Sequence, residues 1–507
     1  MHWIDIVVFI LYFFAMLGVG LYFFRKNKST DDYYVGGRNM GSWHIGLSVV
    51  ATDVGGGFSI GLGGLGFLMG VSGSWMLFTG LIGAWLSAVL LIPQVNRLSK
   101  KMPLLTFPQL FKHYYNGNVA LLAGIISGIG YIGFTSSQIL AGAKLASATF
   151  PVLTLNQALL AMGIIAVVYT VAGGLKAVIY TDTVQWIILM SGLIFIGIPL
   201  GYHAVGGFQG IREVLPNAFL RLDNLTGVQF INWAITIIPI WFVGMTLYQR
   251  IYACRDEKTA RRAWFVAGLF EYPIMAFMGV LLGLFARVAA EQGMFEYMGY
   301  TDVAAMDSEM GLPVLLRTVL PVGLTGLMLS AYFSAIMSTA DSCLMAASGN
   351  VVTDIFERVA PRLGRGNILR TSQITTLVIG ALALLLAMNM RNVLDLMLLS
   401  YAFMVSGLFV PVLGVLFWKK TNPTAAFFAM LFGGLVTTVM ELSKMEALQA
   451  LNFPELALPY GLDANVAGIS VSLLTFILLN MALPTTGKPD ENEATSGQTL
   501  QYDQVTR

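Results

Sequence analysis

Long uninterrupted runs of apolar residues dominate this chain and decide what it can fold into. The hydrocarbon core of a bilayer is about 30 Å thick, and a helix needs about 20 apolar residues to cross it. Thirteen runs of the 507-residue chain approach or exceed this length: residues 3–24, 43–70, 74–95, 119–149, 154–173, 180–203, 229–249, 261–289, 312–346, 371–389, 393–418, 424–441 and 464–484. Because these runs are continuous rather than alternating, they predict helices and not barrel strands. We therefore expect an all-α polytopic membrane protein with about thirteen transmembrane helices.

The composition excludes several classes of protein. Charged residues make up 11% of the chain, against about 25% in an ordinary soluble domain, so the expected environment is a lipid bilayer. A net charge of +2 gives no reason to expect nucleic acid, and no obligate protein partner is evident. The four histidines lie far apart and no Walker-type GxxxxGK[ST] motif occurs. These observations argue against a membrane enzyme, a metal cofactor and direct use of ATP.

Basic residues are divided unevenly between the two sides of the predicted spans. Of the 29 Lys and Arg residues, 22 fall after odd-numbered spans or in the C-terminal tail, 6 fall in the other loops, and Lys144 lies within a span. Cytoplasmic loops carry the excess of Lys and Arg in membrane proteins. The split predicts a multi-pass cell-membrane protein with its N-terminus outside and its C-terminus in the cytoplasm. The lack of long outer loops fits a bacterial inner membrane.

Glycines and a charge interrupt the second predicted span. Residues 51–66 include Asp53 followed by three consecutive glycines, Gly55 to Gly57. A glycine costs about 1 kcal/mol in a helix interior, and a charge at the bilayer centre costs at least about 2.5 kcal/mol. Unwound backbone at this depth occurs only where protein buries it or where it lines a cavity. The pattern favours a discontinuous helix at a binding site over a glycine-rich packing face.

Discontinuous helices usually occur in pairs related by an internal repeat. Five spans further along, the seventh span contains Gly244 between Trp241 and Thr246. A single glycine is a weaker signal, so this second break is predicted from its spacing.

Hydroxyl groups and an acid lie within the ninth span. Ala335 precedes Ser338 and Thr339 by three and four residues, which places them on one helix face. These oxygens suit a small hard cation, although such hydroxyls also bond to the carbonyl one turn earlier. Asp341, one turn further on, favours a functional interpretation.

Three other charges fall within or beside predicted spans. Lys144 and Asp395 lie near span ends and are expected to reach the interface. Glu271 lies in the middle of a span, two residues before Pro273. It is either a functional acid or a structural hydrogen-bond partner at a proline kink.

Several of these segments resemble the sodium/solute symporter family, as represented by sodium/proline and choline transporters. The resemblance covers about residues 5–485, and the segments that carry it are DDYYVGGR (31–38), ATDVGGG (51–57), GGLKAVIYTDTVQ (173–185), YQR (248–250) and MSTADS (337–342). The GG…TDxxQ segment is the most specific of them.

This resemblance implies a five-plus-five inverted repeat with broken helices, as in the APC/LeuT-like core. The implied division is a first helix and cytoplasmic loop (1–42), a ten-helix transport core (43–418, with repeats at about 43–203 and 229–418), two C-terminal helices (419–484) and a cytoplasmic tail (485–507). The tail is polar and is expected to be disordered.

The resemblance also implies a set of binding residues. The family's shared Na⁺ site matches the carbonyls of Ala51, Val54 and Ala335 and the hydroxyls of Ser338 and Thr339. The neighbouring solute site matches Asp53, Gly55, Phe134, Ser137, Gln138 and Trp241. A second cation site found in some members matches Asp182, Ser338 and Ser342, with Asp341 here in place of a serine.

The function expected from these features is symport of a small polar solute with Na⁺ by alternating access. Broken-helix amide groups suit a carboxylate, whereas Asp53 and Trp241 suit a cationic group. An amino acid or similar zwitterion satisfies both and is favoured; a monocarboxylate, a sugar and a choline-like cation stay open. The triple glycine and Phe134 depart from the proline branch, and Asp53 departs from the choline branch. A channel or uniporter is a more distant alternative.

Overall fold

The computed structural model of the protein describes residues 2–26, 35–53, 55–102, 104–150, 152–173, 175–359, 368–444, 449 and 454–487. Helices form nearly all of it. The longer ones are α1 (Trp3–Lys26), α3 (Ser42–Asp53), α4 (Gly55–Met69), α5 (Trp75–Leu90), α8 (Gly117–Thr149), α9 (Leu155–Gly173), α10 (Leu175–Gly192), α13 (Gly227–Val243), α15 (Glu257–Leu269), α16 (Ala276–Glu291), α17 (Ser308–Val319), α18 (Leu324–Gly349), α21 (Ile368–Ala387), α22 (Val393–Phe417), α23 (Pro423–Ser443) and α25 (Ala464–Ala482).

Shorter elements connect or continue these helices. They are α6 (Ile92–Lys101), α7 (Pro108–Tyr114), α11 (Ile198–Ala204), α12 (Gly207–Val214), α14 (Met245–Ala253), α19 (Glu357–Val359), the 3₁₀ turns η1 (Gly70–Ser74), η3 (Asn217–Leu220), η5 (Glu296–Met298) and η7 (Pro459–Gly461), and the π-helical segments η2 (Leu193–Gly197), η4 (Phe270–Met275) and η6 (Asn350–Phe356). Strand β1 (Lys420–Thr421) pairs antiparallel with β2 (Thr486–Gly487).

The predicted helical membrane architecture is confirmed, and each of the thirteen predicted runs lies on one, two or three consecutive helical elements. Within the described ranges, nine helical stretches are long and apolar enough to cross a membrane, and the bent pair α13–α14 makes a tenth. Helices α1 and α9 contain shorter apolar segments, Trp3–Tyr12 and Leu155–Val168. The count of thirteen crossings stays a prediction.

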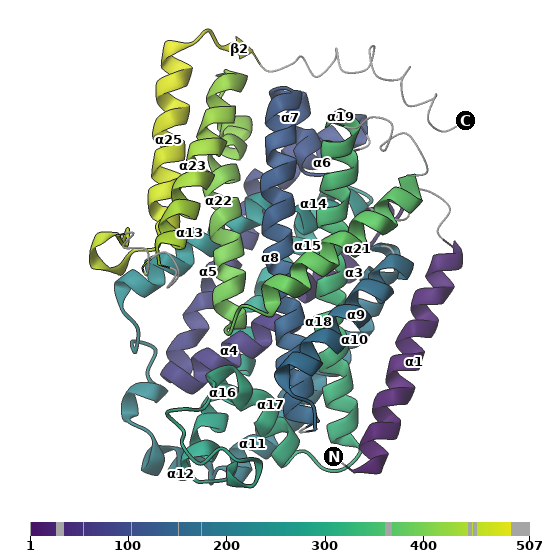
Figure 1. Cartoon of the computed structure of the whole chain (residues 1–507), viewed down its shortest axis with the longest axis vertical. Helices are drawn as coiled ribbons and strands as arrows, with labels where there is room; N and C mark the ends of the chain where they lie inside the picture. The colour runs from purple at the N-terminus through teal and green to yellow at the C-terminus, as the bar shows by residue number, and fades with distance from the viewer. Residues whose placement is uncertain are drawn as a thin grey trace.

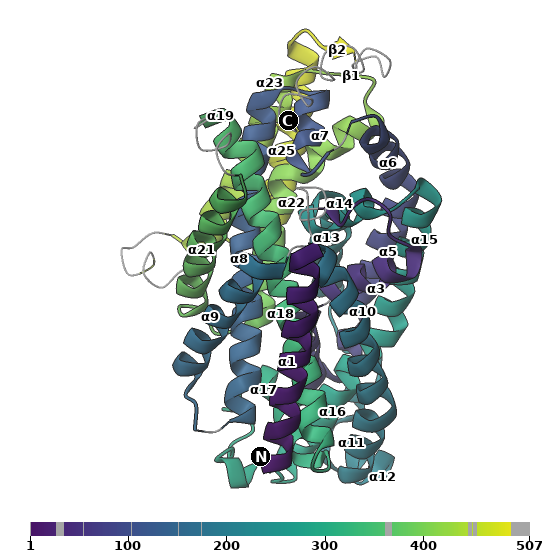
Figure 2. The ribbon, with the colours of Figure 1, turned by 90° about the vertical axis from the view of Figure 1, so that its right-hand side faces the viewer.

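The start of α1 and the last described strand lie at opposite ends of the molecule. Figures 1 and 2 show the start of α1 and strand β2 at opposite ends of the long axis, as an odd number of crossings requires. Helices α6, α7 and α19 lie at the β2 end, whereas α11, α12 and α17 lie at the α1 end. Helix α6 carries Arg97, Lys100 and Lys101, so this basic segment lies at the β2 end, where the predicted topology requires it. The assignment of that end to the cytoplasm stays a prediction.

Close helix packing holds the core together. Helix α8 lies between α18, α22 and α9, while α23 and α25 pack together at one edge and α1 packs on α18 at the other (Figure 1). At the crossing of α4 and α16, a Cβ at Gly66 would lie 2.2 Å from the carbonyl oxygen of Val280. Association of helices in a bilayer depends on such close approach, because lipid is as apolar as the side chains.

Candidate functional site

The first predicted helix break is confirmed. The described part of α3 runs to Asp53 and that of α4 starts at Gly55; Val54, one of the predicted Na⁺ ligands, lies outside the described residues. The break is seen in the backbone of Gly55, whose conformation is left-handed. Gly55 has a φ of +50°, and a Cβ there would lie 2.7 Å from Thr339 Oγ1. Both observations require glycine, since a side chain would be strained in this conformation and would collide with α18.

The second break is also confirmed, at Gly244 between α13 and α14, where the axis bends by 42°. Two tyrosines form hydrogen bonds with backbone groups beside this break. The hydroxyl of Tyr131 on α8 accepts the Thr246 N–H at 3.0 Å, and that of Tyr248 donates to the carbonyl of Phe242 at 2.8 Å. Side chains thus satisfy peptide groups that lipid could not.

Three of the five predicted Na⁺ ligands lie together where α18 faces the first break. Thr339 Oγ1 donates to the carbonyl oxygen of Ala51 at 2.9 Å and to that of Ala335 at 3.2 Å. The Ser338 hydroxyl, a fourth predicted ligand, donates instead to Asp182. If the Thr339 hydroxyl turned its proton away, its oxygen and the carbonyl oxygens of Ala51 and Ala335 could all face one cation. Oxygen is the ligand type that hard cations prefer.

The guanidinium of Arg250 lies at the centre of a buried polar group, which we call the Arg250 cluster: Ser48, Thr52, Asp182, Thr246, Arg250, Ser338 and Ser342. Its Nε donates to Ser48 Oγ at 3.1 Å and its Nη1 to the Thr246 carbonyl at 3.1 Å. Its Nη2 donates to the hydroxyls of Thr52 and Ser342. The cluster joins both broken helices to α10 and α18. The sequence placed Arg250 only in a family motif, without its partners.

Asp182 supplies the negative charge of the Arg250 cluster. One oxygen, Oδ2, accepts from Ser48 at 2.5 Å and lies 3.6 Å from Arg250 Nη2, and the other accepts from Ser338. Asp182 lies in the interior of α10 and is fully buried, so it does not cap that helix. Removing one partner of a buried ion pair leaves an uncompensated charge, which costs about 3–5 kcal/mol.

The residues predicted for a second cation are divided between different partners. Asp341 Oδ1 accepts from Thr170 of α9 at 2.5 Å, and Ser342 accepts from Arg250 at 3.1 Å. Asp182 is paired with Arg250 rather than with Asp341. The two carboxylates are near enough to interact, but each has hydrogen-bond partners of its own. The second cation site stays a prediction.

The predicted solute residues of α8 lie beside α22. The Phe134 ring meets Tyr401 edge-on at a centroid distance of 5.0 Å. Ser137 donates to the Phe134 carbonyl at 2.7 Å, and Gln138 Nε2 lies 3.3 Å from Ser137 Oγ and 3.7 Å from Met397 Sδ.

The predicted solute residue Trp241 lies against other helices. A Cβ at Gly83 of α5 would lie 2.4 Å from its Cδ1 atom, and its ring meets Trp264 of α15 at 6.4 Å. Trp241 Nε1 is buried without a hydrogen-bond partner among the described residues. The indole ring thus packs against α5 and α15, and its N–H group is available as a hydrogen-bond donor.

The expectation that Lys144 reaches the interface is wrong. Lys144 is 1% exposed, and its Nζ lies 2.6 Å from both Glu309 and Asp307. Glu309 also accepts the N–H groups of Val393 and Leu394 at 2.9 Å, at the start of α22. The Glu309 carboxylate is thus stabilised both by Lys144 and by the first N–H groups of α22. Neither contact is predicted by the sequence. Asp395, by contrast, is exposed, and its position at the interface stays a prediction.

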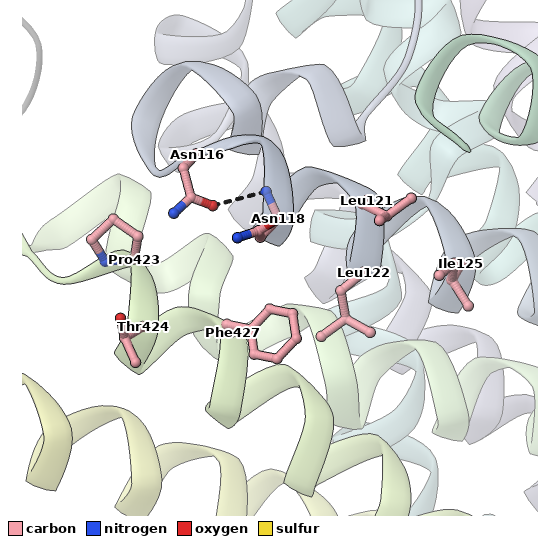
Figure 3. Close-up of a pocket in the computed structure, with 8 residues that line it drawn as sticks. All are labelled: Asn116, Asn118, Leu121, Leu122, Ile125, Pro423, Thr424 and Phe427. Carbon is pink, nitrogen blue, oxygen red and sulfur yellow. Dashed lines mark hydrogen bonds between the residues drawn. The ribbon is translucent and has the colours of Figure 1, made fainter. Parts of the chain in front are cut away.

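A surface pocket lies apart from the helix breaks. It is formed by the starts of α8 and α23, and its lining residues are Asn116, Asn118, Leu121, Leu122, Ile125, Pro423, Thr424 and Phe427 (Figure 3). Asn116 caps α8 by accepting the N–H of Asn118 at 3.0 Å. No predicted site residue lines this pocket, so it is not part of the candidate solute site.

Comparison with known proteins identifies the family. Residues 33–433 match the model of the sodium:solute symporter family. The chain belongs to this family. The osmoregulated proline transporter OpuE of Bacillus subtilis (strain 168) is 28% identical over 493 residues, which cover 93% of this chain and 95% of that protein. The human sodium/myo-inositol cotransporter 2 is 28% identical over 482 residues, which cover 86% of this chain and 70% of that protein.

A solved structure agrees with the fold. A Na⁺-coupled sialic acid symporter, in a substrate-bound outward-open state, matches with a TM-score of 0.75 and 20% sequence identity over 96% of this chain and 99% of that chain. The predicted class of helical symporter with broken helices is thus confirmed. The chain is a sodium-coupled solute symporter of the membrane and not an enzyme.

Proposed function

We propose that this symporter imports a small zwitterionic metabolite, such as an amino acid, together with Na⁺ by alternating access. The observation that carries the proposal is the first helix break, where the Ala51 carbonyl contacts Thr339 at 2.9 Å and Asp53 follows two residues later. A cation and a solute held at the same break would each favour the same arrangement of α3 and α4. The N-terminus lies outside and the C-terminus in the cytoplasm, a topology supported by the position of the basic helix α6 at the β2 end (Figure 1).

The proposed Na⁺ ligands are the carbonyls of Ala51, Val54 and Ala335 and the hydroxyls of Ser338 and Thr339. The two hydrogen bonds of Thr339 support this choice, because they hold three of the five oxygens together. Ser338 joins the set by turning away from Asp182. Asp182, Asp341 and Ser342 are proposed for a second cation only in a state in which Arg250 no longer holds Asp182.

The proposed solute residues are Asp53, Gly55, Phe134, Ser137, Gln138 and Trp241. Relatives named for transport of proline and myo-inositol are equally similar to this chain, so family membership leaves the solute open. An amino acid is favoured because one relative, matched over 93% of this chain, is named a proline transporter, and because Asp53 supplies a counter-charge for an amine. A monocarboxylate, a sugar or a choline-like cation is the alternative.

A two-stage experiment tests the proposal. Purified protein is first screened by thermal shift against amino acids, monocarboxylates, sugars and choline, in Na⁺ and in K⁺. The solute that stabilises the protein only in Na⁺ is then used for uptake into proteoliposomes with an inward Na⁺ gradient. We expect an amino acid to be stabilising and to accumulate above its outside concentration. Uptake that persists without Na⁺ and proton gradients would instead indicate a uniporter or channel.

A further inference from the structure

Glu271 is an acid buried deep in the protein without a partner. It lies in the π-helical segment η4, which interrupts the span formed by α15 and α16, and its exposure is 0%. Neither carboxyl oxygen has a hydrogen-bond partner of ordinary geometry among the described residues. A structural hydrogen bond at the Pro273 kink, one of the two explanations open from the sequence, is therefore not observed. An unpartnered acid within a span is a candidate for function.

The carboxyl group of Glu271 faces that of Asp53 at the first helix break. The two carboxyl groups are close enough to interact with each other. Asp53 is only 7% exposed. Helix α5 leaves room for this arrangement, because a Cβ at Gly80 would lie 2.0 Å from Glu271 Oε2. The glycine thus lets the acid lie between α5 and the break.

Two facing carboxyl groups in a buried site cannot both be ionised unless a positive charge compensates them. Burying an ion costs several kcal/mol unless a counter-charge compensates it, and like charges raise this cost. In the described part of the chain, no salt bridge involves Asp53 or Glu271. Arg250 acts on Asp53 through space, but its N–H groups are used within the Arg250 cluster. A cationic group of a ligand would supply the compensating charge and allow both groups to be ionised.

An independent observation points to the same place. The hydroxyl of Tyr401 on α22 is buried and lacks a hydrogen-bond partner among the described residues, and the side chain is 2% exposed. This tyrosine interacts electrostatically with both Asp53 and Glu271, and its ring contacts Phe134. An unused hydroxyl and two aromatic faces beside two carboxylates suit a nitrogen cation, which binds to carboxylates and to aromatic rings alike.

We propose that Asp53 and Glu271 together bind a positively charged nitrogen of the transported solute, with Tyr401 beside it. The inference rests on the proposed function and narrows it: an ammonium-bearing solute is required, and neutral sugars and simple monocarboxylates are excluded. The Na⁺ ion occupies the neighbouring oxygen set around Thr339 and not the carboxylate pair. Glu271 was not among the solute residues matched to the family.

The experiment compares solutes that differ only in the nitrogen. Binding of alanine and propionate, proline and cyclopentanecarboxylate, and ethanolamine and ethylene glycol is measured by calorimetry on the purified full-length protein in saturating Na⁺, with myo-inositol alongside. We expect binding only from nitrogen-bearing members. Glu271→Gln, which keeps the shape but removes the charge, should weaken that binding at least about tenfold, equivalent to about 1.4 kcal/mol.

Gly80→Ala gives a second test that keeps both charges. The added methyl group displaces the Glu271 carboxylate, so nitrogen-dependent binding should weaken as in Glu271→Gln. Gly128→Ala on α8 is the matched control, because a Cβ there meets nothing within 4 Å. Melting in Na⁺ alone reports whether each variant is folded, and a misfolded Glu271→Gln leaves Gly80→Ala to decide.

Three results would overturn the inference. The first is tight binding of a nitrogen-free compound to the parent protein. The second is full affinity of both Glu271→Gln and Gly80→Ala for the amine. The third is weakened Na⁺ binding by Glu271→Gln in the absence of solute, which would mean that the carboxyl pair binds sodium. Failure of the proposed function is a separate outcome: amine binding that does not respond to Na⁺ removes the coupling but keeps the nitrogen preference.

Discussion

Removal of the Thr339 hydroxyl tests the proposed Na⁺ site most directly. In Thr339→Ala the oxygen that now lies 2.9 Å from the Ala51 carbonyl and 3.2 Å from the Ala335 carbonyl is absent. In the ion-bound state one of five proposed ligands is lost. A hydrogen bond to a charged group contributes about 1.5–3 kcal/mol, and an ion–oxygen contact in the same range corresponds to a 10- to 100-fold change, at about 1.4 kcal/mol per factor of ten. The half-saturating Na⁺ concentration should rise by that factor.

The assay is initial solute uptake into proteoliposomes as Na⁺ is varied at fixed ionic strength. Thr339→Ser keeps the hydroxyl and loses only the methyl group, so it should stay near the parent. Ser338→Ala should raise the Na⁺ requirement as well, if Ser338 turns from Asp182 to the ion. Alanine is well tolerated in a helix, so both variants should insert normally. A Na⁺ requirement unchanged in both alanine variants would refute the site.

Three further predictions concern buried charges. Asp53→Asn should weaken sodium coupling more than folding, as shown by uptake at limiting against saturating Na⁺; normal transport would mean that the side chain only caps a half-helix, a role that asparagine also fills. A second cation site predicts two Na⁺ per solute in the parent and one in Asp341→Ala; a parent ratio of one, which the pairing of Asp182 with Arg250 favours, would refute that site. Lys144→Met should lower the melting temperature by leaving its acidic partners unpaired, at a cost of about 3–5 kcal/mol, whereas the exposed Lys420→Met should not; equal melting of the two would contradict a structural role for Lys144.

The helix breaks could be predicted because their cause is local. Consecutive glycines beside Asp53 disfavour a continuous helix whatever surrounds them, and Gly55 indeed has a left-handed φ of +50°. The contact between Ala335 and Thr339 was equally accessible, since residues four apart share a helix face. Apolar run length fixed the positions of the helices for the same reason, because the bilayer sets one length scale for all of them.

The partners of the buried charges could not be predicted, because they come from distant parts of the chain. Arg250 contacts Ser48 and Asp182 from two other helices, and nothing in the spacing of these residues relates them. Lys144 shows the same limit. Its position near a span end gives its approximate depth in the membrane, but whether it extends to water or pairs with Glu309, 165 residues away in sequence, depends on which helix packs beside it.

The last turn of α3 connects the proposed sites for ion and solute, and this arrangement makes a quantitative demand. The Ala51 carbonyl contacts Thr339, a proposed Na⁺ ligand, and Asp53 belongs to the proposed solute site. Whatever factor Na⁺ contributes to solute affinity, solute must contribute to Na⁺ affinity, and couplings of this kind amount to about 1–3 kcal/mol. Gly55→Ala, which forces a side chain into the break 2.7 Å from Thr339 Oγ1, should shrink that factor, whereas Gly128→Ala should preserve it. Calorimetric titrations of each ligand with and without the other give both factors. A factor of one in the parent, or an undiminished factor in Gly55→Ala, would show that ion and solute are not coupled through this break.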